Sequence, residues 1–132
     1  YRNVLRFSRI MHIGSTVVGH IADGLDAVDV VDSILPAGTL SGAPKLRACQ
    51  IIQDLEGAKR GIYGGAIGYL DLTGNLDTCI GIRLAYKKDG RVCVQTGAGI
   101  VADSVPANED QECRNKARAV IEALHTAEGG LA

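Results

Sequence analysis

The sequence lacks tryptophan, has a single phenylalanine, and contains only 4% aromatic residues over its 132 positions. Too few aromatic side chains are present to build the stacking surface on which single-stranded nucleic acid binds. Positive charge is not in excess either, because 14 lysine and arginine residues are balanced by 15 aspartate and glutamate residues. The formal net charge of -1 argues against attraction to nucleic acid or to an anionic membrane.

Long apolar runs are also missing. None approaches the roughly 18 residues that a membrane-spanning helix needs, and no secretory signal pattern is present. The sequence begins Tyr1-Arg2-Asn3, without methionine, which suggests a fragment or a processed product. A hydrophobic share of 46% and a charged share of 22% are typical of a globular protein. We expect one domain over residues 1–132, since the length is too short for two packed cores.

The cysteines do not form a CxxC pair, which excludes the usual spacing for zinc binding or thiol redox chemistry. They are Cys49, Cys79, Cys93 and Cys113. Their spacing does not exclude disulfides, but a chain of this size does not need them. We therefore expect reduced thiols, packed as small apolar groups, in a cytoplasmic protein.

Apolar residues at helical spacing predict three helices, over residues 25–35, residues 44–55 and from Pro106 to about His125. Asp23 is the expected N-cap of the first helix, and Gly57 is expected to end the second. The segment between these two helices is dense in glycine, proline and hydroxyl residues and is predicted to be a loop.

An apolar period of two predicts strands over residues 9–21, 64–72, 76–86, 91–96 and 100–102. Turn residues separate the later strands, and Lys88-Asp89-Gly90 is typical of a hairpin. Successive strands of this kind form an antiparallel meander. The predicted fold class is therefore α+β, with an antiparallel sheet meander and flanking helices.

Two glycine-containing segments superficially resemble nucleotide-binding loops. In residues 38–45, Ala43 occupies the second glycine position of a phosphate loop and Pro44 separates it from the lysine. Gly97-Ala98-Gly99 lacks the third glycine of a dinucleotide fingerprint, and an extended segment follows where a helix is required. Nucleotide binding is therefore not supported, although bare glycine amides can still approach an anion closely.

Arg83 is predicted on the polar face of its strand, two residues after Gly81. A guanidinium group there is able to hold a carboxylate through two parallel hydrogen bonds, which lysine cannot do. The alternative is a solvated arginine or a partner for Asp77. His12, inside an apolar segment, is open to two interpretations: a hydrogen-bonded core histidine or a catalytic one.

Glu109, Glu112 and Lys116 share one face of the last predicted helix. Two carboxylates one turn apart suit Mg²⁺, which binds through one or two carboxylates together with the anion of its ligand. The alternative is a solvated, charged helix surface. Taken together, a magnesium-binding face, a carboxylate-binding arginine and a backbone anion site describe a site for a small polyanion.

Five segments resemble the chorismate-utilising enzyme family. They are residues 11–13, 36–48, 60–69, 74–78 and 95–104, and the match runs in order along nearly the whole chain. The string Gly38-Thr39-Leu40-Ser41-Gly42-Ala43-Pro44-Lys45 is most similar to the component I branch of the anthranilate synthases. The resemblance implies that this chain is the C-terminal part of a larger α/β fold, in which antiparallel sheets pack orthogonally between helices.

The resemblance also implies roles for individual residues. The carboxylates of chorismate would be held by Tyr63, Arg83 and the backbone of Gly97, Ala98 and Gly99. The catalytic group would be His12 and Thr39, which line the reacting ring, and Lys116, which lies close to the substrate. The cofactor would be Mg²⁺, with Glu112 as a ligand and Glu109 beside it in the outer shell.

The activity implied is the conversion of chorismate and ammonia to anthranilate and pyruvate, in tryptophan biosynthesis, with ammonia supplied by a glutamine amidotransferase subunit. Two alternatives stay open: an aminodeoxychorismate or isochorismate synthase segment, and a non-catalytic domain that binds a dicarboxylate or a partner. The family's other magnesium carboxylates would lie upstream of residue 1. We therefore expect little or no turnover by the isolated chain, and apolar surface exposed where neighbours are missing.

Overall fold

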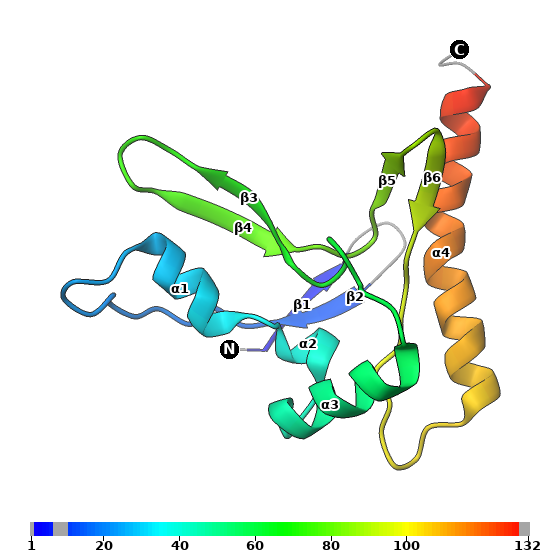
Figure 1. The fold of residues 1–132 in the computed structure, drawn as a ribbon, viewed down its shortest axis with the longest axis horizontal. Coiled ribbons are helices and arrows are strands. Elements are labelled where there is room, and N and C mark those ends of the chain that lie inside the picture. The colour runs from blue at the N-terminus through cyan, green and yellow to red at the C-terminus, as the bar shows by residue number, and fades with distance from the viewer. Residues whose placement is uncertain (1, 7–10, 130–132) are drawn as a thin grey trace.

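Short helices and two-stranded antiparallel sheets alternate along the chain in a computed structural model, which describes residues 2–6 and 11–129 (Figure 1). The strands are β1 (Asn3–Arg6), β2 (Met11–Gly14), β3 (Ala66–Leu70), β4 (Leu76–Ile80), β5 (Ala85–Lys88) and β6 (Arg91–Val94). The helices are α1 (Ala27–Ile34), α2 (Gly38–Ser41), α3 (Lys45–Glu56) and α4 (Pro106–Glu128). The mixed α+β class expected from the sequence agrees with this architecture.

The predicted meander is wrong for the described residues, because the strands pair only within three separate hairpins: β1 with β2, β3 with β4, and β5 with β6. The single strand predicted over residues 76–86 is divided into β4 and β5. The division falls at Arg83, whose φ of 53° lies in the left-handed region and cannot continue a strand. Figure 1 shows the result: the β3–β4 hairpin projects over α1, whereas the β5–β6 hairpin lies beside α4.

The other predicted strands are longer than the observed ones. Within the described part of residues 9–21 only β2 is a strand, because its partner β1 has four residues and pairing ends at Gly14. The predicted strands 64–72 and 91–96 shorten to β3 and β6. The predicted strand 100–102 is irregular, since no described strand lies beside it to accept its hydrogen bonds.

The first helix begins later than predicted, because Asp26 rather than Asp23 is its N-cap. The Asp26 carboxylate accepts hydrogen bonds from the backbone N–H groups of Val28 and Asp29, at 2.8 and 3.2 Å. The Asp29 carboxylate in turn accepts one from the Asp26 N–H at 2.8 Å. This reciprocal capping box fixes the start of α1, because it provides acceptors for more of the free N–H groups at the helix start than a single cap would.

Helix α3, the second of the predicted helices, agrees with its prediction to within one residue, and Gly57 ends it in the left-handed conformation at φ 60°. The segment predicted as a loop between α1 and α3 contains one helical turn, α2. Ser41 accounts for that turn: its hydroxyl donates to the carbonyl of Ala37 at 3.0 Å, and its side chain is buried. The last helix extends to Glu128, three residues beyond the predicted end.

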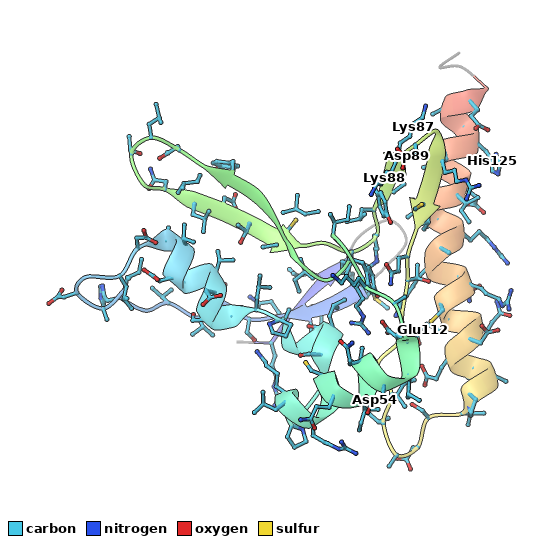
Figure 2. All side chains as sticks on the ribbon, in the orientation of Figure 1. Asp54, Lys87, Lys88, Asp89, Glu112 and His125 are labelled. Carbon is cyan, nitrogen blue, oxygen red and sulfur yellow. The ribbon has the colours of Figure 1, made fainter. Side chains whose placement is uncertain are left out.

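Very little of the described chain is buried. Among the described residues only Ala37, Ser41, Tyr63 and Gly81 are buried, whereas Leu46 and Leu55 of α3 are 82% and 80% exposed. The expected exposure of apolar surface is therefore observed. Figure 2 shows side chains projecting outward from most elements, with Lys87, Lys88 and Asp89 at the tip of the β5–β6 hairpin. None of the described helices is both long enough and apolar enough to cross a membrane.

The turn between β3 and β4 is organised by one carboxylate. Asp71 accepts hydrogen bonds from the backbone N–H and the hydroxyl of Thr73, at 2.8 and 2.7 Å. It also accepts from the backbone N–H and the side-chain amide of Asn75, at 2.9 and 3.0 Å. These bonds stabilise the charged form and lower the pKa of Asp71 to about 2.

Acid is expected to weaken this turn. Because the pKa of Asp71 in the folded chain is about 2, below the value of about 3.9 for an unfolded aspartate, its contribution is complete above about pH 4 and is lost as the pH falls through 2. The carboxyl ¹³C signal of Asp71 and the amide signals of Thr73 and Asn75 should titrate together near pH 2. Asp71→Asn should remove that titration, and a midpoint near pH 4 would contradict the network.

Candidate functional site

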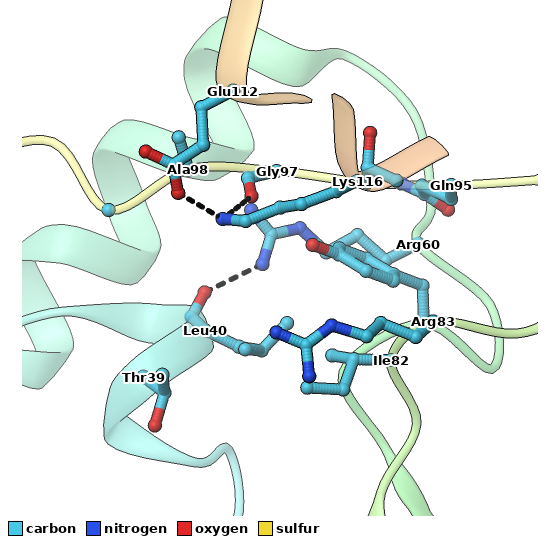
Figure 3. Close-up of a pocket in the computed structure, with 13 residues that line it drawn as sticks. Thr39, Leu40, Arg60, Ile82, Arg83, Gln95, Gly97, Ala98, Glu112 and Lys116 are labelled. Carbon is cyan, nitrogen blue, oxygen red and sulfur yellow. Dashed lines mark hydrogen bonds and ion pairs between the residues drawn. The ribbon is translucent and has the colours of Figure 1, made fainter. Parts of the chain in front are cut away.

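A cavity of about 340 Å³ lies where five segments of the chain meet (Figure 3). Its walls come from α2, from the turn before β3, from the link between β4 and β5, from residues 95–99, and from α4. In that order, the lining residues are Thr39 and Leu40, Arg60 and Tyr63, Ile82 and Arg83, Gln95 to Gly99, and Glu112 and Lys116.

Most of the residues predicted from the sequence share this cavity. Those that line it are Thr39, Tyr63, Arg83, Gly97, Ala98, Gly99, Glu112 and Lys116. They come from segments up to 77 positions apart, so their convergence does not follow from sequence proximity. Arg83 and Glu112 in particular lie on the walls of one cavity, as a shared polyanion site requires.

Two predicted residues lie elsewhere. Glu109 is on α4, one turn before Glu112, but it is not part of the cavity lining. His12 is in β2, with its backbone opposite Leu5 of β1, and its side chain is outside what the structure describes.

Close backbone approach places Tyr63 in the cavity wall. Gly64 N–H donates to the Gly81 carbonyl at 2.8 Å, and Gly81 N–H donates to the Gly65 carbonyl at 2.8 Å. A Cβ atom on Gly81 would collide with the carbonyl oxygen of Ile62. Only glycine therefore allows the turn that carries Tyr63 to lie directly on the link that carries Arg83.

The Tyr63 side chain is 9% exposed, and burial raises the pKa of its phenol. The hydroxyl is therefore protonated at neutral pH and able to donate a hydrogen bond. A second close approach fixes its position: a Cβ atom on Gly97 would lie 2.9 Å from the Tyr63 hydroxyl oxygen. The glycine at position 97 thus makes room for the phenol at the cavity edge.

The backbone of Arg83 is left-handed, with a φ of 53°, and it separates β4 from β5. The sequence placed it on a regular strand face, which is wrong. In Figure 3 its guanidinium group points across the cavity toward α2, on the same side as that of Arg60.

Lys116 is held at the opposite wall. Its ammonium group contacts Glu112 Oε1 at 2.6 Å and donates a hydrogen bond to the Gly97 carbonyl at 2.9 Å. The contact with Glu112 is an i,i+4 ion pair of α4, whereas the bond to Gly97 joins α4 to the segment after β6. Lys116 therefore fixes the glycine segment against the helix.

Arg60 is the main cavity residue that the sequence analysis missed. Its Nε and Nη2 donate to the two carboxylate oxygens of Glu56, at 2.8 and 2.5 Å, and its Nη1 donates to the Leu40 carbonyl at 2.7 Å. The Glu56 hydrogen bonds raise the pKa of Arg60 and the Arg60 hydrogen bonds lower that of Glu56. The i,i+4 spacing of a carboxylate and an arginine was the available signal.

The cavity carries an excess of positive charge. Three cationic side chains line it, Arg60, Arg83 and Lys116, against the single carboxylate of Glu112. Gly97, Ala98 and Gly99 line it as well. A small anionic molecule is therefore the complementary ligand.

A magnesium ion would find only part of a site here. No three histidine, cysteine, aspartate or glutamate side chains gather into a metal site within residues 2–6 and 11–129. Glu112 nevertheless presents a carboxylate, 54% exposed, at the cavity wall. One such carboxylate fits Mg²⁺, which completes its shell with water and with the ligand's own oxygens.

Comparison with known proteins agrees with this arrangement. A family model described as chorismate binding enzyme matches residues 1–122. The chain belongs to this family. The chain is 58% identical over 123 residues to an anthranilate synthase component 1 of Pseudomonas aeruginosa, covering 93% of this chain and 25% of that protein. It is 56% identical over 125 residues to an anthranilate synthase component 1 of Acetivibrio thermocellus, covering 95% of this chain and 25% of that protein.

A solved structure also has a similar fold. The crystal structure of anthranilate synthase component I from Streptococcus pneumoniae TIGR4 superposes with a TM-score of 0.88 at 50% identity, covering 91% of this chain and 28% of that one. The resemblance inferred from the sequence is confirmed. The chain spans about a quarter of the length of the curated relatives that it matches.

Gly97→Ala is expected to lower the free energy of unfolding by about 1–3 kcal/mol, because the new methyl group would press against a buried phenol. It should also shift the ζ-carbon NMR signal of Tyr63. Gly99→Ala is the matched control, since a Cβ atom there meets nothing within 4 Å. If the two variants were equally stable, with Tyr63 signals like the wild type, the close approach would be refuted.

Proposed function

We propose that this chain supplies the chorismate-binding wall of an anthranilate synthase component I. The reaction converts chorismate and ammonia to anthranilate, pyruvate and water. One observation carries the proposal: Arg83, Lys116, the Tyr63 phenol and a glycine-containing backbone segment converge on one cavity, in a family described as chorismate binding enzymes. Relatives that match this chain at 50–58% identity are named anthranilate synthase component 1.

In this proposal, Arg83 and the Tyr63 hydroxyl bind the carboxylates of chorismate. Arg83 offers two parallel N–H donors, and Tyr63 offers a neutral O–H donor at neutral pH. The amides of Gly97, Ala98 and Gly99 complete the anion site, with Lys116 close to the bound substrate. The close approach between Tyr63 and Gly97 already fixes the phenol and the glycine segment, so neither has to move when the substrate binds.

Thr39 and His12 are proposed to line the reacting ring, Thr39 from α2 and His12 from β2. Thr39 lies in the cavity wall, which supports its assignment. A histidine is able to transfer a proton or to stabilise developing charge near neutral pH. The proposed role of His12 rests on the family resemblance alone.

Glu112 is the proposed magnesium ligand, with Glu109 in the outer shell. When bound, Mg²⁺ would neutralise substrate charge and so assist departure of the ring hydroxyl. Lys116 now holds Oε1 of Glu112, so that oxygen becomes available only if the ammonium group moves.

Ammonia is proposed to come from a glutamine amidotransferase subunit in the cytoplasm, where thiols stay reduced; the four free cysteines support that location. The 132-residue chain alone is proposed to have little or no turnover. Its exposed apolar side chains and the single cavity carboxylate support this view, because much of a complete site would be contributed by further polypeptide.

A chimera tests the proposed function. The chain replaces the matching segment of the Pseudomonas aeruginosa relative, and chorismate, ammonium and Mg²⁺ are supplied. We expect fluorescent anthranilate and an equal amount of pyruvate, whereas the isolated chain should give neither. An aminated product without pyruvate, or isochorismate, would assign the chain to another branch, and chorismate binding without turnover would favour a non-catalytic domain.

Arg83→Met in this chimera is expected to lower kcat/KM for chorismate by about 100-fold, because a substrate carboxylate would lose a charged, two-bond partner. Arg91→Met is the matched control, since Arg91 lies on β6 outside the cavity lining. Equal kinetics in the two variants would remove Arg83 from the substrate site.

Glu112→Gln is expected to raise the Mg²⁺ concentration for half-maximal activity at least about tenfold, and to weaken Mn²⁺ binding measured by electron paramagnetic resonance. Glu109→Gln should have a smaller effect. Asp110→Asn is the control on the same helix, because Asp110 pairs with Arg114 outside the cavity. Unchanged Mn²⁺ binding by Glu112→Gln would exclude Glu112 as a ligand.

A further inference from the structure

Two hollows in the molecule share one wall. Beside the 340 Å³ cavity is a larger groove of about 810 Å³, between the end of α1, the inner side of α3 and the turn before β3. Leu40, Arg60 and Tyr63 line both hollows. These three residues therefore form a partition between the proposed substrate cavity and the neighbouring groove.

Arg60 connects the parts of this partition. Its Nη1 donates to the Leu40 carbonyl at 2.7 Å, which fixes the end of α2 next to Thr39. Its guanidinium carbon lies 5.7 Å from the ring centroid of Tyr63, within the range of a cation–π contact. The arginine thus joins two cavity walls, the end of α2 and the turn that carries Tyr63.

Glu56 orients Arg60 from the groove side. It lines the groove but not the cavity, and its two oxygens accept the Nε and Nη2 hydrogens of Arg60 as a fork. Three of the five N–H donors of the guanidinium group are therefore committed to protein acceptors. A group committed in this way is suited to positioning its neighbours rather than to receiving a substrate carboxylate.

We propose that Arg60, oriented by Glu56, is a positioning residue that holds Leu40 and Tyr63 as the partition between the two hollows. The inference rests on the proposed function for its kinetic consequences but not for the partition itself. Without Arg60, Tyr63 and the end of α2 would shift.

The kinetic test is a double-mutant cycle in the chimera. Arg60→Met should lower kcat/KM about 10- to 100-fold, mostly in kcat, because small displacements of groups around the reacting ring are costly. Glu56→Gln should lower it in the same way, although Glu56 does not line the cavity. The double variant should fall within about threefold of Arg60→Met, since both changes disable one unit. Arg60→Lys should restore part of the loss.

A second readout does not depend on chorismate. Nitration of individual tyrosines, followed by peptide mass spectrometry, reports whether Tyr63 is shielded; Tyr69, 63% exposed, is the internal reference. Tyr63 should be nitrated much more slowly than Tyr69 in the wild type and at a comparable rate in Arg60→Met and in Glu56→Gln. Inactivity of the wild-type chimera would refute the proposed function, while the nitration pattern would still decide the role of Arg60.

Arg114→Met is the matched control, because Arg114 forms the same i,i+4 contact with Asp110 at 2.8 Å but lies exposed on α4. It should change neither kinetics nor nitration. A raised KM in Arg60→Met with no effect of Glu56→Gln would overturn the proposal and make Arg60 a substrate ligand. Continued protection of Tyr63 in both variants would also overturn it.

Discussion

The burial of one phenol organises this chain. Tyr63 contacts the guanidinium group of Arg60, lies against Gly97, and is carried by a turn that rests directly on Gly81. Few other contacts join the three hairpins and the helices, so these approaches determine how the cavity walls face one another. Two of them depend on the absence of a Cβ atom, which makes steric space, rather than attraction, the first requirement of the site.

The cavity combines this steric requirement with charge. Arg60 is neutralised by Glu56 behind the wall, and Lys116 is paired with Glu112 at the opposite wall. Protein carboxylates and backbone carbonyls therefore orient Arg60 and Lys116 before any ligand binds. A dianionic ligand would gain from groups that are already oriented, so less ordering is required when it binds.

Local signals in the sequence predicted local structure well. Gly57 ends α3 as expected, and Lys88-Asp89-Gly90 turns the last hairpin, with Asp89 and Gly90 both at positive φ. The strand lengths and the meander were wrong, because strand pairing depends on partners distant in the chain. Periodicity also could not reveal that the backbone at Arg83 turns left-handed. Eight of the residues assigned from family motifs line one cavity, whereas Glu109 does not.

The left-handed backbone of Arg83 has two opposite effects, one on stability and one on the cavity. A side chain at φ 53° strains the backbone, and glycine would adopt the same conformation more easily. Yet the strained residue carries the guanidinium group that points across the cavity. Selection for heat resistance alone would favour glycine at position 83, and the cavity would then lose one of its guanidinium groups while the backbone became less strained.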